Sequence, residues 1–188
     1  MKEHPILFST EMVKAILAGN KTQTRRVILR RERDEVGSIR IRPENNYSVD
    51  MILQCFKCPY GKTGDHLWVR ESFSTVDKGN FIIYKADGLT AEEVGIDKIR
   101  WKPSIHMPRR FCRIKLEVID IRVERVQDIS IPDVDAEGFG WHDQWDCLPD
   151  FAKTWNNING KRGFGWDVNP FVWVITFQVE RKSNEQKS

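Results

Sequence analysis

The chain has 188 residues and a formal net charge of +3, and 40% of its residues are hydrophobic and 30% charged. This composition excludes an intrinsically disordered chain, and the lack of any run of 18 apolar residues excludes a membrane-spanning helix. The first residues do not follow the basic-then-apolar pattern of a signal peptide, so we expect a cytosolic protein.

The length favours a single domain, which we place at residues 1–180, followed by a mobile polar tail at 181–188. Residues 30–62 are rich in charge, with Pro43, Asn45-Asn46 and Gly61, and few apolar runs. They are expected to form a loop-rich insertion that contains one strand at 39–42.

The remaining elements follow from hydrophobic periodicity and from capping residues. Ser9 is expected to cap a helix of about three turns that ends at Gly19. Apolar alternation over 112–126 changes phase at Val118-Ile119, which indicates a bulge or a sharp bend. The other expected elements are strands at 4–8, 22–28, 66–70, 81–84 and 171–179, and helices at 132–138 and 148–158. These patterns predict an α+β fold with a mostly antiparallel sheet.

The strongest chemical signal is the run Lys21-Thr22-Gln23-Thr24-Arg25-Arg26 at the turn between the first helix and the second strand. Alternation along a strand would place Thr22, Thr24, Arg26 and Ile28 on one face. Desolvation lowers the pKa of a lysine, so that its neutral amine can accept a proton from a threonine hydroxyl. The same residues could instead contact phosphate, or they could form a surface cluster without a function.

Two basic clusters stand out against the small net charge. One covers residues 21–42 and includes Lys21 and Arg25, and the other includes Lys98, Arg100 and Arg109. A net charge of +3 is too small to attract nucleic acid over the whole molecule, so binding would be local. Solvated charge on strands and loops is the alternative reading.

Cysteines and the remaining polar residues give no pattern for a metal site. Cys55 and Cys58 have the spacing of half a zinc site, but no second Cys-x-x-Cys follows. We therefore expect reduced thiols, no metal and no cofactor.

Several motifs together resemble the ASCH family, whose fold is the PUA-like small mixed, mostly antiparallel β-barrel with short flanking helices. They are the helix followed by Gly19-x-Lys21-Thr22-x-x-Arg25, then Cys58-Pro59-Tyr60-Gly61, Gly64-Asp65-x-Leu67-Trp68-Val69-Arg70-Glu71, Trp101-x-Pro103-Ser104-Ile105-His106-Met107-Pro108 and Phe171-Val172-Trp173-Val174. The chain is most similar in this respect to the long ASCH proteins of tailed phages and prophages. The resemblance implies that RNA or a modified nucleoside is the partner.

The family includes RNA-binding members, nucleases and a small amidohydrolase that removes the acetyl group from N4-acetylcytidine. The resemblance to that amidohydrolase implies a catalytic set of Lys21, Thr24 and Glu137. In it Thr24 would attack the amide carbonyl, Lys21 would take its proton or hold the oxyanion, and Glu137 would orient the lysine. The insertion at 30–62 and the Trp-rich segment at 141–166 depart from the minimal family.

Further residues are candidates for contact with substrate or RNA: Arg25, Arg26, Glu71, His106 and Arg109. Arg26 would contact phosphate or a base edge. Glu71 would either form an internal ion pair with Arg70 or compete for the acid role, and His106 is either a substrate contact or a structural residue.

The leading hypothesis is an RNA- or nucleoside-directed protein with possible amide hydrolysis of an N4-acylated cytidine. The alternatives are a noncatalytic RNA-binding module and a metal-independent ribonuclease that uses Lys21 and Arg26. The burial of Lys21 separates the amide hydrolase from the noncatalytic RNA-binding module. A catalytic lysine has to be largely buried, whereas a binding groove can leave the lysine in water.

Overall fold

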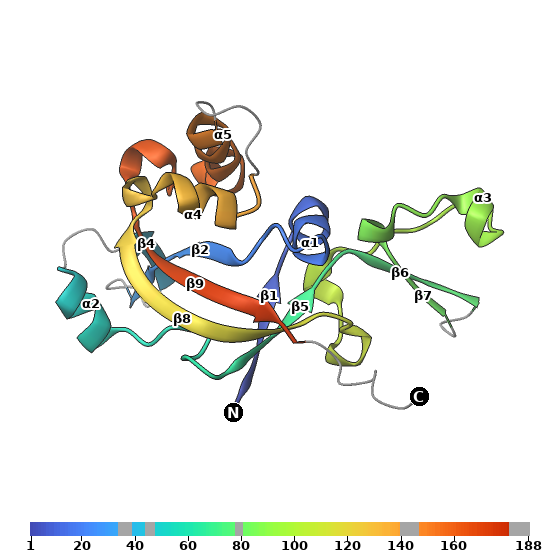
Figure 1. Ribbon diagram of the computed structural model, residues 1–188, viewed down its shortest axis with the longest axis horizontal. Coiled ribbons are helices and arrows are strands. Elements are labelled where there is room, and N and C mark those ends of the chain that lie inside the picture. The colour runs from blue at the N-terminus through green and yellow to red at the C-terminus, as the bar shows by residue number, and fades with distance from the viewer. Residues whose placement is uncertain (34–38, 44–47, 78–80, 140–146, 181–188) are drawn as a thin grey trace. The chain divides into compact units, whose positions relative to one another are not determined.

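The computed structural model describes residues 1–33, 39–43, 48–77, 81–139 and 147–180 (Figure 1). The strands are β1 Glu3–Leu7, β2 Gln23–Val27, β3 Leu29–Arg33, β4 Ile39–Pro43, β5 His66–Arg70, β6 Phe73–Val76, β7 Phe81–Tyr84, β8 Lys115–Arg125 and β9 Phe171–Val179. The α-helices are α1 Thr10–Leu17, α2 Val49–Cys55, α3 Ala91–Val94, α4 Ile131–Ala136 and α5 Cys147–Asn159.

The main sheet has five strands in the order β1-β5-β8-β9-β2, and two further sheets are the pairs β3-β4 and β6-β7. β1 pairs with β5 in parallel. The pairs β2-β9, β3-β4, β5-β8 and β6-β7 are antiparallel. The predicted α+β class and mostly antiparallel sheet are confirmed, whereas closure of the sheet into a barrel stays a prediction.

The chain divides into two compact units, and each is built from separate stretches of sequence. Unit 1 contains residues 1–19, 59–118 and 177–188. Its core includes the buried side chains of Ile6 on β1, Leu67 and Val69 on β5, and Leu116 on β8. Ser9 caps α1 by accepting a hydrogen bond from the backbone N–H of Met12, as the sequence predicts.

Unit 2 contains residues 20–58 and 119–176. Figure 1 shows α4 and α5 side by side over β2 and β9 in this unit. Valines of β9 pack with α4 and α5 in one apolar cluster: Val126, Ile129, Val134, Phe151, Trp155, Val172 and Val174. This cluster holds α4 against β2 and thereby positions the polar side chains described below.

The sequence placed most of the regular elements correctly but misjudged residues 30–62. The strand expected at 39–42 is present as β4, but it pairs with β3, and the helix α2 was not expected. Ser48 caps α2, so the signal was a single serine within a charged segment. Along β8, Leu116 and Val118 are buried, then Ile119 is exposed and Val123 is buried, which fits the predicted phase change.

Among the described residues no helix is both long and apolar enough to cross a membrane. The expected mobile tail at 181–188 lies outside the described residues. The assignment of residues 1–180 to one domain stays a prediction.

Candidate functional site

Lys21 lies in the short stretch between α1 and β2, where the chain pairs with the end of α4. Its backbone forms an isolated antiparallel bridge with Glu137, and the N–H of Thr22 donates to the carbonyl of Ala136 at 2.8 Å. The side chain is fully buried, and its Nζ donates to the Glu137 carbonyl at 2.7 Å and to Glu137 Oε2 at 2.6 Å. Two residues 116 positions apart in the sequence are therefore joined by main chain and side chain.

Glu137 owes its position to the capping of α4. Ser130 caps the helix by accepting from the N–H of Asp133, and Pro132 lies in the first turn. Glu137 is the C-cap residue, and Gly138 follows with a φ of +92°, a left-handed conformation that favours glycine. The helix predicted at 132–138 is present as Ile131–Ala136, with Pro132 in its first turn and Gly138 just after its C-cap.

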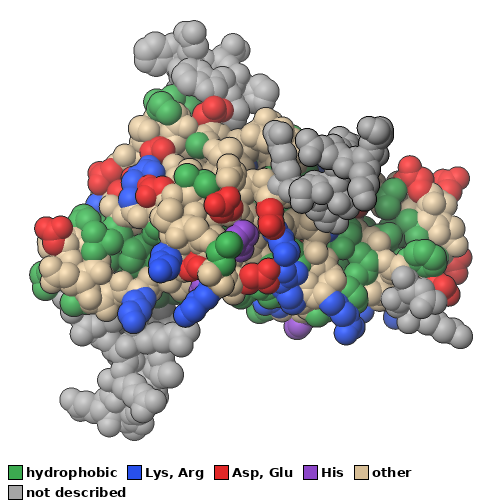
Figure 2. Space-filling view, turned by 60° about the horizontal axis from the view of Figure 1, so that its bottom comes forward, with side chains coloured by type: hydrophobic (Ala, Val, Ile, Leu, Met, Phe, Trp, Pro, Cys, Tyr) green, Lys and Arg blue, Asp and Glu red, His purple; other side chains and the backbone are tan. Residues whose placement is uncertain are grey.

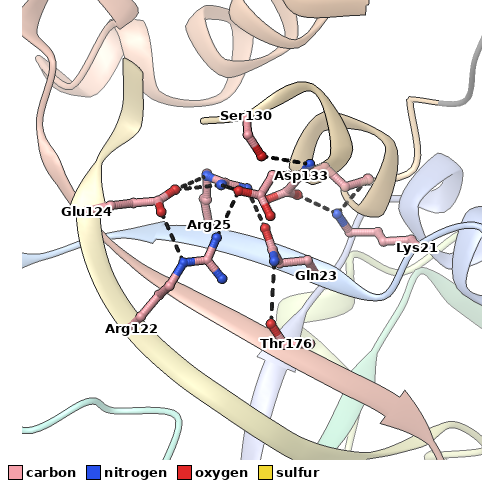
Figure 3. A network of polar contacts seen from close by, with 9 residues as sticks. Lys21, Gln23, Arg25, Arg122, Glu124, Ser130, Asp133 and Thr176 are labelled. Atoms are coloured by element: carbon pink, nitrogen blue, oxygen red, sulfur yellow. Dashed lines mark hydrogen bonds and ion pairs between the residues drawn. The ribbon is translucent and has the colours of Figure 1, made fainter. Parts of the chain in front are cut away.

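Arg25 on β2 lies among three carboxylates (Figure 3). Its Nη1 donates to Glu137 Oε1 at 3.2 Å, its Nη2 to Asp133 Oδ2 at 3.1 Å, and its Nε to Glu124 Oε1 at 2.9 Å. Nη1 also donates to Gln23 Oε1 at 2.7 Å. Strand alternation explains this gathering, because Gln23 and Arg25 are two residues apart and share a face with Lys21.

Arg122 and Thr176 complete this group of residues, which we call the polar network. Arg122 donates to Glu124 Oε2 at 3.1 Å and to Asp133 Oδ2 at 2.9 Å, and Gln23 Nε2 donates to the Thr176 hydroxyl at 3.4 Å. The network contains as many cations as carboxylates: Lys21, Arg25 and Arg122 against Glu124, Asp133 and Glu137. Its charges therefore compensate one another.

Burial and neighbouring groups together lower the pKa values of Lys21 and Asp133 in the network. Desolvation lowers the pKa of Lys21, and the nearby Arg26 and Arg25 lower it further, while Glu137 opposes the shift. Partial burial alone would raise the pKa of Asp133, but the hydrogen bond from Gln23 and the charge of Arg25 bring it below its ordinary value. A lysine with a lowered pKa beside a carboxylate is a candidate for proton transfer.

Thr24 and Arg26 lie on the opposite face of β2. Register pairs Thr24 with Ile175 and Arg26 with Trp173, and residues directly opposite in a sheet share a face. Thr24 is buried and Arg26 half-buried. The register agrees with the expectation that these two residues share a face. The printed side-chain contacts of Glu137 are with Lys21 and Arg25, and the expectation that the Thr24 and Arg26 face opens on a cavity near Glu137 stays a prediction.

Glu71, which belongs to unit 1, forms its ion pair with Arg113 rather than with Arg70. The two carboxylate oxygens accept from Arg113 at 2.9 and 3.0 Å, and Arg113 also donates to Asp87 at 2.6 Å. Glu71 is buried, and its contacts with Arg113 are those of a structural ion pair. The predicted Arg70–Glu71 pair is corrected, and Arg70 instead donates to the carbonyl of Ile105.

His106 and Arg109 also belong to unit 1. His106 ends a short turn, Ser104–His106, and is exposed. Arg109 forms a bidentate pair with Glu3 at 2.8 and 2.7 Å, and its guanidinium lies 5.8 Å from the centre of the Trp68 ring. Neither residue belongs to the polar network, and their roles in binding stay predictions.

Residues 98–115, which we call the basic segment, contain seven Lys or Arg residues and no Asp or Glu. Carboxylates elsewhere in unit 1 neutralise Arg109, Arg113 and Lys115. The other four cations are exposed and form no ion pair with any residue that the structure describes: Lys98, Arg100, Lys102 and Arg110. The Arg110 guanidinium lies 4.7 Å from the centre of the half-buried Phe111 ring. On the face seen in Figure 2, basic and acidic side chains lie next to one another in several places.

Five members of the polar network were not predicted from the sequence: Gln23, Arg122, Glu124, Asp133 and Thr176. Two signals could have found some of them. Arg122 and Glu124 are two residues apart on a strand and so share a face, and Asp133 and Glu137 are four apart on a short helix. Only the tertiary fold shows that β8 and α4 bring these side chains to Arg25.

In the part of the chain that the structure describes, no three His, Cys, Asp or Glu side chains are grouped to hold a metal ion. Cys55 is exposed and Cys58 is partly exposed. That Cys55 and Cys58 bind no zinc stays a prediction.

The fold and the site thus define an α+β protein with a mostly antiparallel sheet and a buried, charge-compensated polar network.

No family model and no curated protein matches the sequence. A solved protein from Enterococcus faecalis, described as a member of the family DUF984, is similar to this chain with a TM-score of 0.48 and 9% identity, over 100% of this chain and 86% of that one. A solved ASCH domain from Lactobacillus crispatus is similar with a TM-score of 0.45 and 12% identity, over 95% of this chain and 79% of that one. Likeness at this level does not assign the chain to a family or transfer an activity to it.

Proposed function

We propose that this chain binds RNA or a nucleotide-like ligand through the basic segment. The observation that carries the proposal is the set of four exposed cations, Lys98, Arg100, Lys102 and Arg110, which have no carboxylate partner among the described residues. When such cations bind the phosphates of a nucleic acid, they replace the counterions condensed there, and the release of these counterions drives binding. Cations that already form ion pairs would have to break them first.

Aromatic rings close to the cations extend the same surface. Arg110 lies over Phe111, and Trp101 is half-buried within the basic segment. Partly exposed aromatic rings next to cations suit single-stranded RNA, because unstacked bases pack on aromatic side chains while the cations follow the backbone. Single-stranded RNA is therefore the proposed ligand class, with a nucleoside phosphate as its smallest form.

The test is binding of a fluorescently labelled single-stranded RNA, followed by anisotropy at 0.1 M salt. Replacing Lys102 and Arg110 by Gln removes two phosphate contacts, and we expect a loss of affinity of about 25-fold, since affinity scales with salt to the power of about −0.7 per contact. The matched control replaces Lys153 and Lys161, which are exposed in unit 2, by Gln. Equal affinities for the two double variants would refute the proposed surface.

A second function, hydrolysis of an amide on a modified nucleoside of the N4-acylcytidine type, is favoured by one observation. The Lys21 side chain is completely buried and bonded to Glu137 at 2.6 Å, and desolvation lowers the pKa of Lys21. A neutral lysine in that position could accept a proton from the attacking group, and the protonated lysine could return the same proton through Glu137 to the leaving amine. Thr24 as the attacking group stays a prediction, because its side chain lies on the other strand face.

Mass detection of deacylated product from N4-acetylcytidine, with unmodified cytidine as the blank, tests this activity. Lys21→Ala and Glu137→Gln should each reduce turnover by a factor of about 100 or more, the range for general acid–base groups. Thr24→Val separates attack by the threonine hydroxyl from attack by a water molecule, because it abolishes turnover only if the threonine attacks. Absence of turnover in the unaltered protein would rule the activity out, and unchanged turnover in Lys21→Ala would rule out Lys21 as its proton acceptor.

A further inference from the structure

We infer that Arg25 is a positioning residue, which holds one carboxylate oxygen of Glu137 and leaves the other to Lys21. The inference rests on the proposed amide hydrolysis. Glu137 Oε1 accepts from Arg25 Nη1 at 3.2 Å, and Glu137 Oε2 accepts from Lys21 Nζ at 2.6 Å. The two cations thus divide the carboxylate between them and fix the direction in which it faces.

Arg25 can hold a carboxylate in place because its own guanidinium is fixed from three elements. Glu124 on β8 and Asp133 on α4 accept from it, and so does the Gln23 side chain on β2. The Arg25 side chain is also 1% exposed. A planar guanidinium with donors in a fixed fork loses its freedom when several of its N–H groups are occupied. Movement of Glu137 would therefore require several of these contacts to break together.

The charge of Arg25 also acts on Lys21 itself. Within the described part of the chain, the charged groups that act on Lys21 include Glu137 at the end of α4, which favours the protonated lysine, and Arg25 and Arg26 from β2, which disfavour it. Removing the Arg25 charge should therefore raise the pKa of Lys21. A residue that stabilised the fold without placing its charge near Lys21 would leave the pKa of this lysine unchanged.

Arg122 provides the matched control. It donates to Glu124 and Asp133, two of the carboxylates that Arg25 contacts, but the described structure contains no contact between Arg122 and Glu137. Its side chain is 38% exposed. Arg122→Gln removes the same charge from the same network without releasing the Glu137 carboxylate.

The experiment follows the Lys21 Cε resonance by ¹³C NMR during a pH titration of the full chain, with Lys21→Ala to assign the signal. We expect the Lys21 midpoint to rise by about one unit in Arg25→Gln, the shift expected for the loss of a close charge, and to stay within a few tenths in Arg122→Gln. The inference is overturned if Arg25→Gln leaves the midpoint unchanged or if Arg122→Gln raises it equally.

Arg25→Lys keeps the inference testable if Arg25→Gln does not fold. This substitution keeps the charge but loses the fork of donors, so we expect a low Lys21 midpoint together with a fall in kcat and an unchanged KM for N4-acetylcytidine. An unchanged kcat in Arg25→Lys, in a protein that turns the substrate over, would contradict a positioning role. The titration can be read in a protein without hydrolase activity, so failure of the proposed function and failure of this inference are distinguishable.

Discussion

The buried pair of Lys21 and Glu137 is expensive to form and sensitive to the loss of either partner. Desolvation of two charges cancels much of their attraction, so such a pair is weak evidence for stability by itself. Removal of one partner leaves an uncompensated buried charge, at a cost of about 3–5 kcal/mol. In this chain Arg25 shares the carboxylate, so the loss of Lys21 still leaves Glu137 with a cation. We therefore expect Lys21→Ala to remain folded, which the activity test requires.

Glu3 allows a direct test of electrostatics at the residue scale. The hydrogen bonds from Arg109, with help from Lys115, lower the pKa of Glu3 from 4.5 to about 2. A carboxyl group with a depressed pKa in the folded state contributes stability above its unfolded pKa, and this contribution is lost as the pH falls from 4.5 towards 2.

In Arg109→Gln we expect the pKa of Glu3 to return most of the way to 4.5, with Lys115 keeping it slightly lower. A ¹³C titration of the Glu3 carboxyl measures the change, and Arg110→Gln is the control, because Arg110 has no contact with Glu3 among the described residues. A Glu3 pKa that does not change in Arg109→Gln would show that the bidentate pair does not form in solution.

Single residues also show how far the sequence predicted the site. Lys21 and Glu137 were proposed together through a family resemblance, and they are in direct contact. Arg25 was proposed for binding, but its side chain is buried among carboxylates. Its partners Glu124 and Asp133 lie about 100 residues away in the sequence. No local pattern links positions so far apart, so the network could not be predicted from the sequence.

At the scale of elements, α4 connects the apolar core of unit 2 to the polar network. Val134 packs into the core, while Asp133 and Glu137 on the same helix contact Arg25. The helix has only six residues, too few to be stable without packing and caps. The Ser130 cap is therefore needed to hold both carboxylates in place.

Ser130→Ala removes the acceptor for the N–H of Asp133, and we expect a loss of about 1 kcal/mol in the free energy of unfolding. Urea denaturation measures the loss. Ser130→Asn, which supplies another good capping side chain, should restore stability to within a few tenths of a kcal/mol. If the Ala and Asn variants are equally stable, Ser130 does not act as a cap.

Elements with a clear apolar pattern were predicted well, even the four-residue β7, whereas β6 and α3 were not predicted. β9 matches its predicted residues because it is a run of β-branched and aromatic residues that forms no other element. β6 has four residues and includes Ser74 and Thr75, so it carries no apolar alternation, and α3 also has only four residues. Such elements depend on their partners, which the sequence does not show.

At the scale of the whole molecule, charge is distributed unevenly along a chain whose net charge is only +3. The polar network of unit 2 compensates its own charges, whereas the basic segment of unit 1 has four cations without an acidic partner in the described residues. Long-range attraction of nucleic acid is therefore weak, and binding should depend on the local cations.

The salt dependence of RNA affinity tests this account most directly. Four phosphate contacts to a single strand predict that the logarithm of affinity falls against the logarithm of salt with a slope of about −2.8. The slope should shrink by about 1.4 when Lys102 and Arg110 are replaced by Gln, and should stay the same when Lys153 and Lys161 are replaced. A slope near zero, or the same slope in both double variants, would contradict binding through the basic segment.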